Sequence, residues 1–172
     1  DIVVLGIPYG SPYTIDEVTN DQTNAPTAVR QATDRALRSI ERYDFDIGGP
    51  LMDNRPIHMV DCGDITANPR DLNGHYEIAE SVVRKIVMLG AMPLIIGGDH
   101  GIPIPVLRAL DSFDEITLIH IDAHLDWRDE VNGVPDGYSS PIRRASEMKH
   151  IGKIFQIGLR ANGSARQEEV DM

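Results

Sequence analysis

The 172-residue sequence has little cysteine, few aromatic residues and little positive charge. Its single cysteine, Cys62, excludes a disulfide framework and a cysteine-rich zinc module. We expect Cys62 to be a small buried residue in a protein of a reducing compartment. Sixteen basic against 27 acidic side chains give a net charge of −11, which argues against a nucleic-acid partner, since tracking phosphates needs a basic face. No apolar run approaches the roughly 20 residues of a membrane span, so we expect a cytoplasmic protein with no membrane partner.

The chain also lacks an initiator methionine. Its opening residues, DIVVLG, are neither a signal peptide nor a natural start, and they indicate the first strand of a domain whose leading residues are missing. No repeat, charge run or low-complexity linker divides the chain after this strand. We therefore expect residues 1–172 to form one incomplete domain.

Short apolar runs alternate with helical periods along the chain. Strands are predicted at Ile2–Leu5, Ile57–Val60, Leu94–Ile96, Ile116–Ile121 and Ile154–Ile157, each of them a nearly continuous apolar run of the kind buried on both faces. Helices are predicted from Pro26 through Tyr43, over Ile78–Val87 before a stop at Gly90, and over Ile104–Leu110. This alternation predicts a three-layer α/β/α fold with a mainly parallel sheet. Two long polar stretches, Tyr9–Asn24 and Asp44–Arg55, suit functional lids, with disorder as the alternative.

The strongest chemical signal is Asp122, His124 and Asp126 in the stretch IHIDAHLD, directly after a predicted strand. In an extended chain, residues two apart point to the same side, about 6.5 to 7 Å from each other. Three ligand-type side chains would therefore converge at the carboxyl end of a strand, where open α/β sheets keep their sites. The spacing favours metal binding over the alternative, which is an aspartate that caps the next helix.

A second signal, GGDH at Gly97–His100, comes directly after the preceding predicted strand. The two glycines allow a sharp turn and a close backbone approach, and His100 then emerges at the same edge of the sheet. Two histidines with two carboxylates suit Mn²⁺, with Ni²⁺, Co²⁺ or Zn²⁺ as alternatives. Carboxylates can bridge two ions about 3.5–4 Å apart that ionise water at neutral pH, so the pattern predicts metal-assisted hydrolysis.

GGDH and then DAHLD, each after a buried strand, resemble the motifs of the ureohydrolases: arginase, agmatinase and the guanidino-acid hydrolases. Further matches are VVLGIPYG, NAPTAVRQA, VDCGD at Val60–Asp64 and FQIGLR at Phe155–Arg160. The resemblance covers essentially the whole chain and implies an arginase-like fold. It also implies a site with two Mn²⁺ ions that hydrolyses a guanidino group to urea and an amine, in a homo-oligomer of three or six subunits.

The same resemblance assigns roles to four residues. His100 matches the ligand of one metal, His124 matches the ligand of the other, and Asp122 matches a carboxylate that bridges both. Asp126 matches a ligand of the first metal that also hydrogen-bonds the bridging hydroxide, which makes it the catalytic candidate. The family's later motif, S-x-D-x-D-x-x-D-P, supplies two further ligands and is absent here. We therefore expect an N-terminal portion holding four of six ligands, truncated at its C-terminus.

A second departure concerns the proton-shuttle histidine that many relatives carry in an H-G-x-P-F-type segment. Here the segment is DGYSSPIRRA, with Pro141 matched and Tyr138 or Asp136 nearest to the histidine position. We expect Tyr138 to be an aromatic wall, with proton donation as the alternative. The departure also leaves open a related formimino or amidino hydrolase, or a catalytically degenerate subunit that supports an active partner.

Other polar residues have plainer interpretations. His120 lies two residues before Asp122, so it can face the site, although a satisfied core histidine is the commoner case. Arg128 is expected at the surface, with a pairing to a substrate carboxylate as the alternative. The residues that bind the substrate are not identified by the sequence. Tyr9, Tyr13 and Asp16 are candidates for the site entrance, and His58, His75 and His150 are expected to be structural or exposed.

Overall fold

The computed structural model describes residues 1–18, 21–53, 55–66, 68, 71–163 and 166–171. Its strands are β1 (Ile2–Ile7), β2 (Tyr43–Asp44), β3 (Gly49–Pro50), β4 (Met59–Asp64), β5 (Met92–Gly97), β6 (Ile116–Ile121) and β7 (Ile151–Ile157). Its helices are α1 (Ile15–Val18), α2 (Ala25–Leu37), α3 (Leu72–Met88), α4 (Pro103–Arg108), α5 (Pro141–Ser146) and α6 (Gln167–Val170), with a 3₁₀ turn at Asp21–Asn24. All five predicted strands are present, and the predicted α/β class is confirmed.

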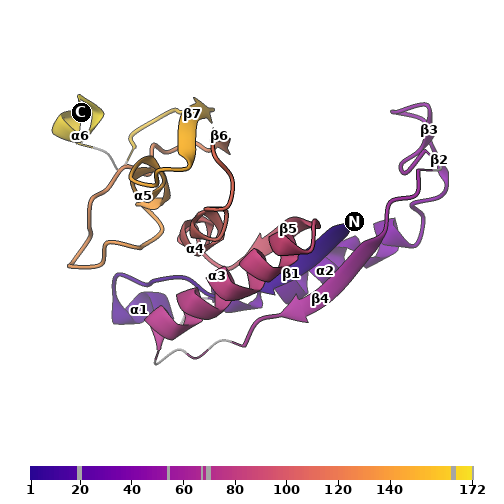
Figure 1. The fold of residues 1–172 in the computed structure, drawn as a ribbon, viewed down its shortest axis with the longest axis horizontal. Coiled ribbons are helices and arrows are strands. Elements are labelled where there is room, and N and C mark those ends of the chain that lie inside the picture. Colours follow the sequence, from indigo (N-terminus) through magenta and orange to yellow (C-terminus); the bar gives the residue numbers. More distant parts are fainter. Residues whose placement is uncertain (19–20, 54, 67, 69–70, 164–165, 172) are drawn as a thin grey trace.

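The strands form two parallel sheets and one small hairpin (Figure 1). In the first sheet, β1 lies between β4 and β5 and runs parallel to both. In the second, β6 pairs in parallel with β7, and the hairpin is the antiparallel pair β2–β3. Among the described residues, β5 and β6 share no backbone pairing. The two sheets are connected through the helices instead, because α3 packs on α4, α4 on α5, and α5 on β7.

The main hydrophobic core lies between β1 and α3. Leu5 and Ile7 of β1 pack with Ala79, Val83 and Ile86 of α3, and all five side chains are buried. Burial of this size contributes about 1.5–3 kcal/mol for each large aliphatic side chain. This core therefore fixes β1, and with it the neighbouring end of β5.

The ends of α3 are explained by local chemistry. The Asp71 side chain accepts a hydrogen bond from the backbone N–H of Gly74 at 2.9 Å, which satisfies one free donor of the first turn. After the last turn, Gly90 has a φ of +73°, a conformation that glycine adopts without steric cost. The predicted stop at Gly90 is confirmed.

Helix α2 is tied to β4 by an arginine. Arg30 donates from Nε and Nη2 to the two carboxylate oxygens of Asp61 at 2.7 and 2.8 Å, and from Nη1 to Asp64. The hydrogen bonds from Arg30 hold the pKa of Asp61 below its usual range. A bidentate contact of this kind fixes the orientation of α2 relative to β4 as well as holding the two elements together.

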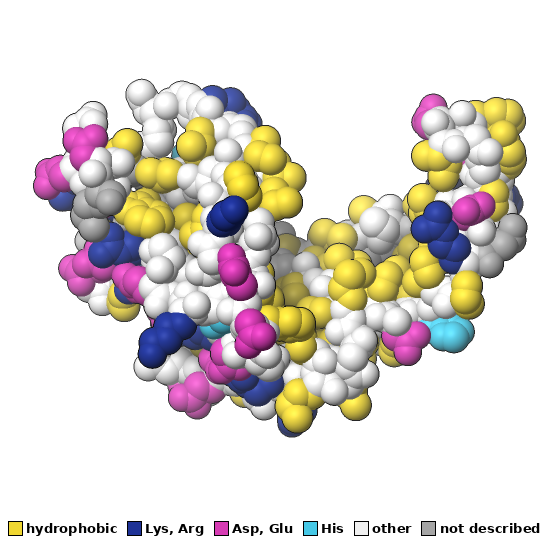
Figure 2. Space-filling model, turned by 45° about the horizontal axis from the view of Figure 1, so that its top comes forward, with side chains coloured by type: hydrophobic (Ala, Val, Ile, Leu, Met, Phe, Trp, Pro, Cys, Tyr) yellow, Lys and Arg dark blue, Asp and Glu magenta, His cyan; other side chains and the backbone are white. Residues whose placement is uncertain are grey.

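Three expectations from the sequence are wrong. Leu94, Ile119 and Ile121 are 47%, 61% and 78% exposed, so β5 and β6 are not buried on both faces, because no described element covers the second face. Figure 2 shows hydrophobic side chains gathered in the hollow beside the projecting hairpin. Helix α2 ends at Leu37 and Tyr43 enters β2; Val29 and Leu37 of the predicted apolar stripe are exposed, so burial of the stripe does not extend the helix further. Cys62 is exposed rather than buried.

Among the described residues, no helix has both the length and the apolar character needed to cross a membrane.

His75 at the start of α3 makes the stability of this core dependent on pH. Its side chain is 2% exposed and lies edge-on to Tyr9, with ring centroids 4.9 Å apart. Burial lowers the pKa of His75, and the backbone of Thr66 offsets only part of that effect. Below the unfolded-state pKa of about 6.5, the unfolded chain binds a proton that the folded chain does not.

We therefore expect the free energy of unfolding to fall as the pH drops below about 6.5, and to be unaffected by His75 above that value. Thermal unfolding at pH 8 and pH 5 measures this difference. The variant His75→Phe should show a smaller difference, whereas His58→Gln, at an exposed histidine, should leave it unchanged. An equal pH dependence in wild type and His75→Phe would contradict the assignment.

Candidate metal centre

The site begins at the carboxyl end of β6. The chain continues alongside β7 for one more residue, since the N–H of Asp122 donates to the carbonyl of Ile157 at 3.0 Å. The Asp122 carboxylate then accepts a hydrogen bond from the N–H of His124 at 2.7 Å. This short turn points the Asp122 side chain across the end of the strand and ends the extended conformation.

Asp126 reaches the same space through an unusual backbone conformation. Its φ is +51°, in the left-handed region that aspartate tolerates better than most residues. Its carbonyl accepts hydrogen bonds from Ile142 and Arg143 at the start of α5, at 3.2 and 3.3 Å. These contacts fix the turn, and the side chain is left buried, with Asp126 only 5% exposed. Strained conformations held in this way are common at functional sites.

The GGDH segment supplies the other wall. A Cβ at Gly98 would lie 2.7 Å from the backbone nitrogen of Tyr9, so only glycine allows this turn to pass so close to β1. Asp99 closes the turn by accepting a hydrogen bond from the N–H of Gly101 at 2.7 Å. The turn directs His100 toward β6, and its Nδ1 lies 2.7 Å from Oδ2 of Asp126.

Four side chains converge at this point: His100, His120, Asp122 and Asp126. Each offers one ligand atom, and these atoms all lie within 4.8 Å of one another. Three of the four residues predicted as ligands are therefore brought together. His124 borders the group, with Nδ1 3.2 Å from Asp122 Oδ1 and its side chain 55% exposed. His124 as a ligand of a second ion stays a prediction.

His120 joins the group from inside β6, where the sequence favoured an ordinary core role. The sequence feature that could have placed His120 at the site is the two-residue alternation of a strand, which puts His120 on the same side as Asp122. The ring is 8% exposed and stacks on His100, with centroids 5.3 Å apart and an interplanar angle of 18°. Its Nε2 lies 3.8 Å from Oδ2 of both Asp122 and Asp126.

Neighbouring groups and burial shift the pKa values of three residues of the cluster. The contact with Asp126 raises the pKa of His100, although burial opposes the rise. Burial lowers the pKa of His120, and the neighbouring His100 lowers it further. Burial alone would raise the pKa of Asp122, but the backbone N–H of His124 and the nearby histidines outweigh burial and lower it. At neutral pH, the site therefore holds ionised Asp122 and a neutral His120.

This donor set fits a divalent metal ion. Two ligand atoms that each lie about 2.0–2.2 Å from one ion are at most about 4.4 Å apart, close to the spread of the group. Imidazole nitrogens with carboxylates suit Mn²⁺, Ni²⁺ or Zn²⁺, so the residues do not select one ion. His100 and His120 also line a cleft between β5 and β6, whose facing edges share no backbone pairing among the described residues.

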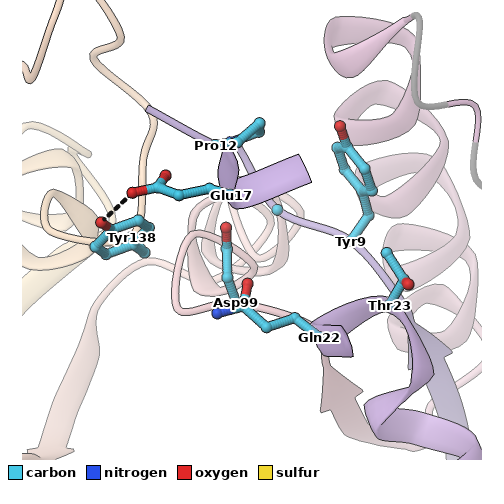
Figure 3. A pocket seen from close by; sticks show the side chains of 8 residues that line it. Tyr9, Pro12, Glu17, Gln22, Thr23, Asp99 and Tyr138 are labelled. Atoms are coloured by element: carbon cyan, nitrogen blue, oxygen red, sulfur yellow. Dashed lines mark hydrogen bonds between the residues drawn. The ribbon is translucent and has the colours of Figure 1, made fainter. Parts of the chain in front are cut away.

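Asp99, the residue before His100, also lines a second and smaller pocket (Figure 3). Glu17 of α1 and Asp99 face each other across it, and the Tyr138 hydroxyl donates to Glu17 Oε1 at 2.9 Å. The rings of Tyr138 and Tyr13 are 4.4 Å apart. Burial and the hydrogen bond to Glu17 raise the pKa of Tyr138 to about 12. Tyr9 also lines this pocket, and its place at the site entrance stays a prediction.

The remaining candidates lie apart from the cluster. Arg128 forms an ion pair with Glu169 of α6, with Nη1 3.3 Å from a carboxylate oxygen. Asp136 is held by Arg108 at 2.8 Å. His58 is exposed beside Asp1, as expected.

Comparison with known proteins matches this geometry to one family. The family model described as the arginase family matches residues 1–172. Guanidinobutyrase of Pseudomonas aeruginosa is 33% identical over 132 residues, which are 75% of this chain and 41% of that protein. Mitochondrial agmatinase of Gallus gallus is 27% identical over 168 residues, 96% of this chain and 47% of that protein.

Solved structures show the same fold. Proclavaminate amidino hydrolase of Streptomyces clavuligerus superimposes with a TM-score of 0.76 at 29% identity, over 97% of this chain and 54% of that one. Formiminoglutamase of Trypanosoma cruzi, solved with Mn²⁺, gives a TM-score of 0.82 over 99% of this chain and 56% of that one; at 24% identity this is a likeness of fold. The chain spans about half the length of the relatives it matches. From the family match along its whole length, the chain belongs to the arginase family.

Proposed function

We propose that this protein hydrolyses a linear guanidino compound to urea and an amine with the help of two divalent metal ions, Mn²⁺ being the first candidate. The observation that carries the proposal is the convergence of His100, His120, Asp122 and Asp126 at the ends of β5 and β6. Relatives named guanidinobutyrase and agmatinase support the substrate class. The proposal concerns the whole protein, since this chain spans about half of those relatives.

Three residues of the cluster, together with the bordering His124, have defined tasks in this proposal. His100 and Asp126 would hold one ion, Asp122 would reach both ions, and His124 would hold the second. Bound ions would supply a water molecule that is ionised near neutral pH. Six ligands are expected for such a pair in the family that the sequence resembles, so two more would come from outside these 172 residues, in the same protein or in a partner subunit.

Asp126 is the residue best placed to orient the attacking water. Its carboxylate is buried, and its backbone is fixed by the left-handed turn and by the amides of α5. Such a carboxylate accepts a hydrogen bond from water without first having to reorganise. It can also take the proton that the water gives up when the trigonal guanidinium carbon is attacked.

The charges around the site favour a substrate with an amine tail over one with a carboxylate tail. Glu17 and Asp99 line the smaller pocket and both are acids, although burial raises the pKa of Asp99. Arg128, the candidate for binding a substrate carboxylate, is occupied by Glu169 at 3.3 Å. A cationic tail such as that of agmatine would therefore meet favourable charge, whereas a guanidino acid would meet repulsion.

Metal binding should stabilise the folded protein. We expect Mn²⁺ at about 100 times its dissociation constant to add about 2.7 kcal/mol to the free energy of unfolding, because only the folded state assembles the ligands. Thermal unfolding with and without Mn²⁺, together with elemental analysis after dialysis, measures this. His100→Asn should lose most of the gain, and His58→Asn, at an exposed histidine, should keep it. An equal gain in both variants would place the ion elsewhere.

The activity itself is tested by urea release from agmatine and from 4-guanidinobutanoate under Mn²⁺ saturation. We expect agmatine to be the better substrate, and Asp126→Asn to lower kcat by about 100-fold or more through loss of the general base. Asp46→Asn, at an exposed acid, serves as the matched control. Hydrolysis of formimino compounds without urea release would support that branch of the family instead. No hydrolysis of either class would support the degenerate subunit.

Tyr138 should act as a wall. Its hydroxyl is committed to Glu17, and a pKa of about 12 makes it a poor proton shuttle near pH 7. We expect Tyr138→Phe to change kcat by less than about threefold, against the 100-fold or larger loss expected when a general acid is removed. Steady-state rates across pH 6–9 measure this, and a loss of 100-fold or more would make Tyr138 the donor.

A further inference from the structure

His120 has a buried ring nitrogen aimed at both carboxylates of the site. Its Nε2 has no hydrogen-bond partner among the described residues, although the residue is 8% exposed. The same nitrogen lies 3.8 Å from Oδ2 of Asp122 and 3.8 Å from Oδ2 of Asp126, within about 1 Å of hydrogen-bonding distance to each. Whether this nitrogen carries a proton decides what His120 does: a bare nitrogen binds metal, and a protonated one donates to a carboxylate.

The neighbouring strand determines the protonation of this nitrogen. Gln156 of β7 lies in register with His120 of β6. Its Nε2 donates to the backbone carbonyl of Leu125 at 2.9 Å. A carbonyl can only accept, so this contact fixes which end of the Gln156 amide is the NH₂ group.

The second proton of the same NH₂ group points to His120. Gln156 Nε2 lies 3.0 Å from Nδ1 of the imidazole. An NH₂ group cannot accept a hydrogen bond, so Nδ1 must be the bare, accepting nitrogen of the ring. In a neutral imidazole the other nitrogen then carries the proton, which places an N–H on Nε2, facing the two aspartates.

We propose that His120 is a positioning residue whose protonated Nε2 is directed at the carboxylates of Asp122 and Asp126, and that Gln156 sets it in this tautomer. A metal bond from Nε2 would move the proton to Nδ1, where it would face the NH₂ group of Gln156 with no acceptor. His120 therefore orients the ligands without being one. The benefit to catalysis rests on the proposed function, whereas the tautomer does not.

The tautomer is measured directly by nitrogen-15 NMR of the metal-free protein labelled at histidine. We expect the His120 signals to show a protonated Nε2 and a bare Nδ1. In Gln156→Glu, a carboxylate would face Nδ1 and draw a proton to it, so the Nδ1 signal should change to the protonated type. A wild-type His120 with its proton on Nδ1 would overturn the proposal, whatever the activity of the protein.

Two substitutions of His120 separate positioning from metal ligation. His120→Gln keeps an N–H donor near the place of Nε2, and His120→Leu removes it. We expect His120→Gln to bind Mn²⁺ within about threefold of wild type, and His120→Leu to bind it about 10- to 100-fold more weakly, the usual effect of losing a group that orients ligands.

Gln156→Leu should weaken Mn²⁺ binding about 10-fold, and Lys153→Gln, at an exposed position of the same strand, should have no effect. Equal losses in His120→Gln and His120→Leu would overturn the positioning role. A protein that shows the expected tautomer and Mn²⁺ affinities but releases no urea would leave this inference standing and refute the proposed function.

Discussion

The rest of this site depends on two carboxylates, those of Asp122 and Asp126, which are directed into one small space. The ligand atoms of Asp122 and Asp126 lie within 4.8 Å of each other, and like charges at such short range repel. The surrounding groups reduce that repulsion: the imidazole of His100 contacts Asp126, and the N–H of His124 caps Asp122. The contact with Asp126 raises the pKa of His100, and the N–H of His124 together with the nearby histidines lowers the pKa of Asp122. A bound cation would compensate the negative charge of the carboxylates in the same way.

Strand β7 supports the turn that carries Asp122 and Asp126, although it supplies no residue of the cluster itself. Three contacts run from β7 and the residues after it to the turn at the end of β6. Ile157 accepts from Asp122, Gln156 donates to Leu125, and Arg160 donates to the carbonyl of Ala123 at 3.1 Å. The segment FQIGLR, which is weak as a motif by itself, thus braces the turn carrying Asp122 and Asp126. Such supporting residues influence a metal site almost as strongly as the ligands do.

Much of the fold could be predicted, because buried strands appear in a sequence as apolar runs and helices appear as apolar residues that recur every three or four positions. For β6, the predicted bounds match the structure. The two-residue alternation of a strand was a less reliable guide to which side chains face the site. It predicted that Asp122, His124 and Asp126 share one side, but the strand ends at Ile121 and Asp126 turns back with a φ of +51°. Within the strand the alternation holds, which is why His120 faces the cluster. The exposed faces of β5 and β6 depend on what covers them, which a local pattern does not encode.

The cluster draws its residues from two segments, one following β5 and one at the end of β6 and beyond it, and these strands share no backbone pairing among the described residues. His100 lies just beyond one sheet, while Asp122 and Asp126 lie just beyond the other, so the contacts of the cluster cross the seam between them. An ion held there would link the segment that follows β5 to the segment that follows β6. Because binding and conformation are linked reciprocally, any strain that parts the two sheets also loosens the ion, and any ion that binds tightly resists their parting.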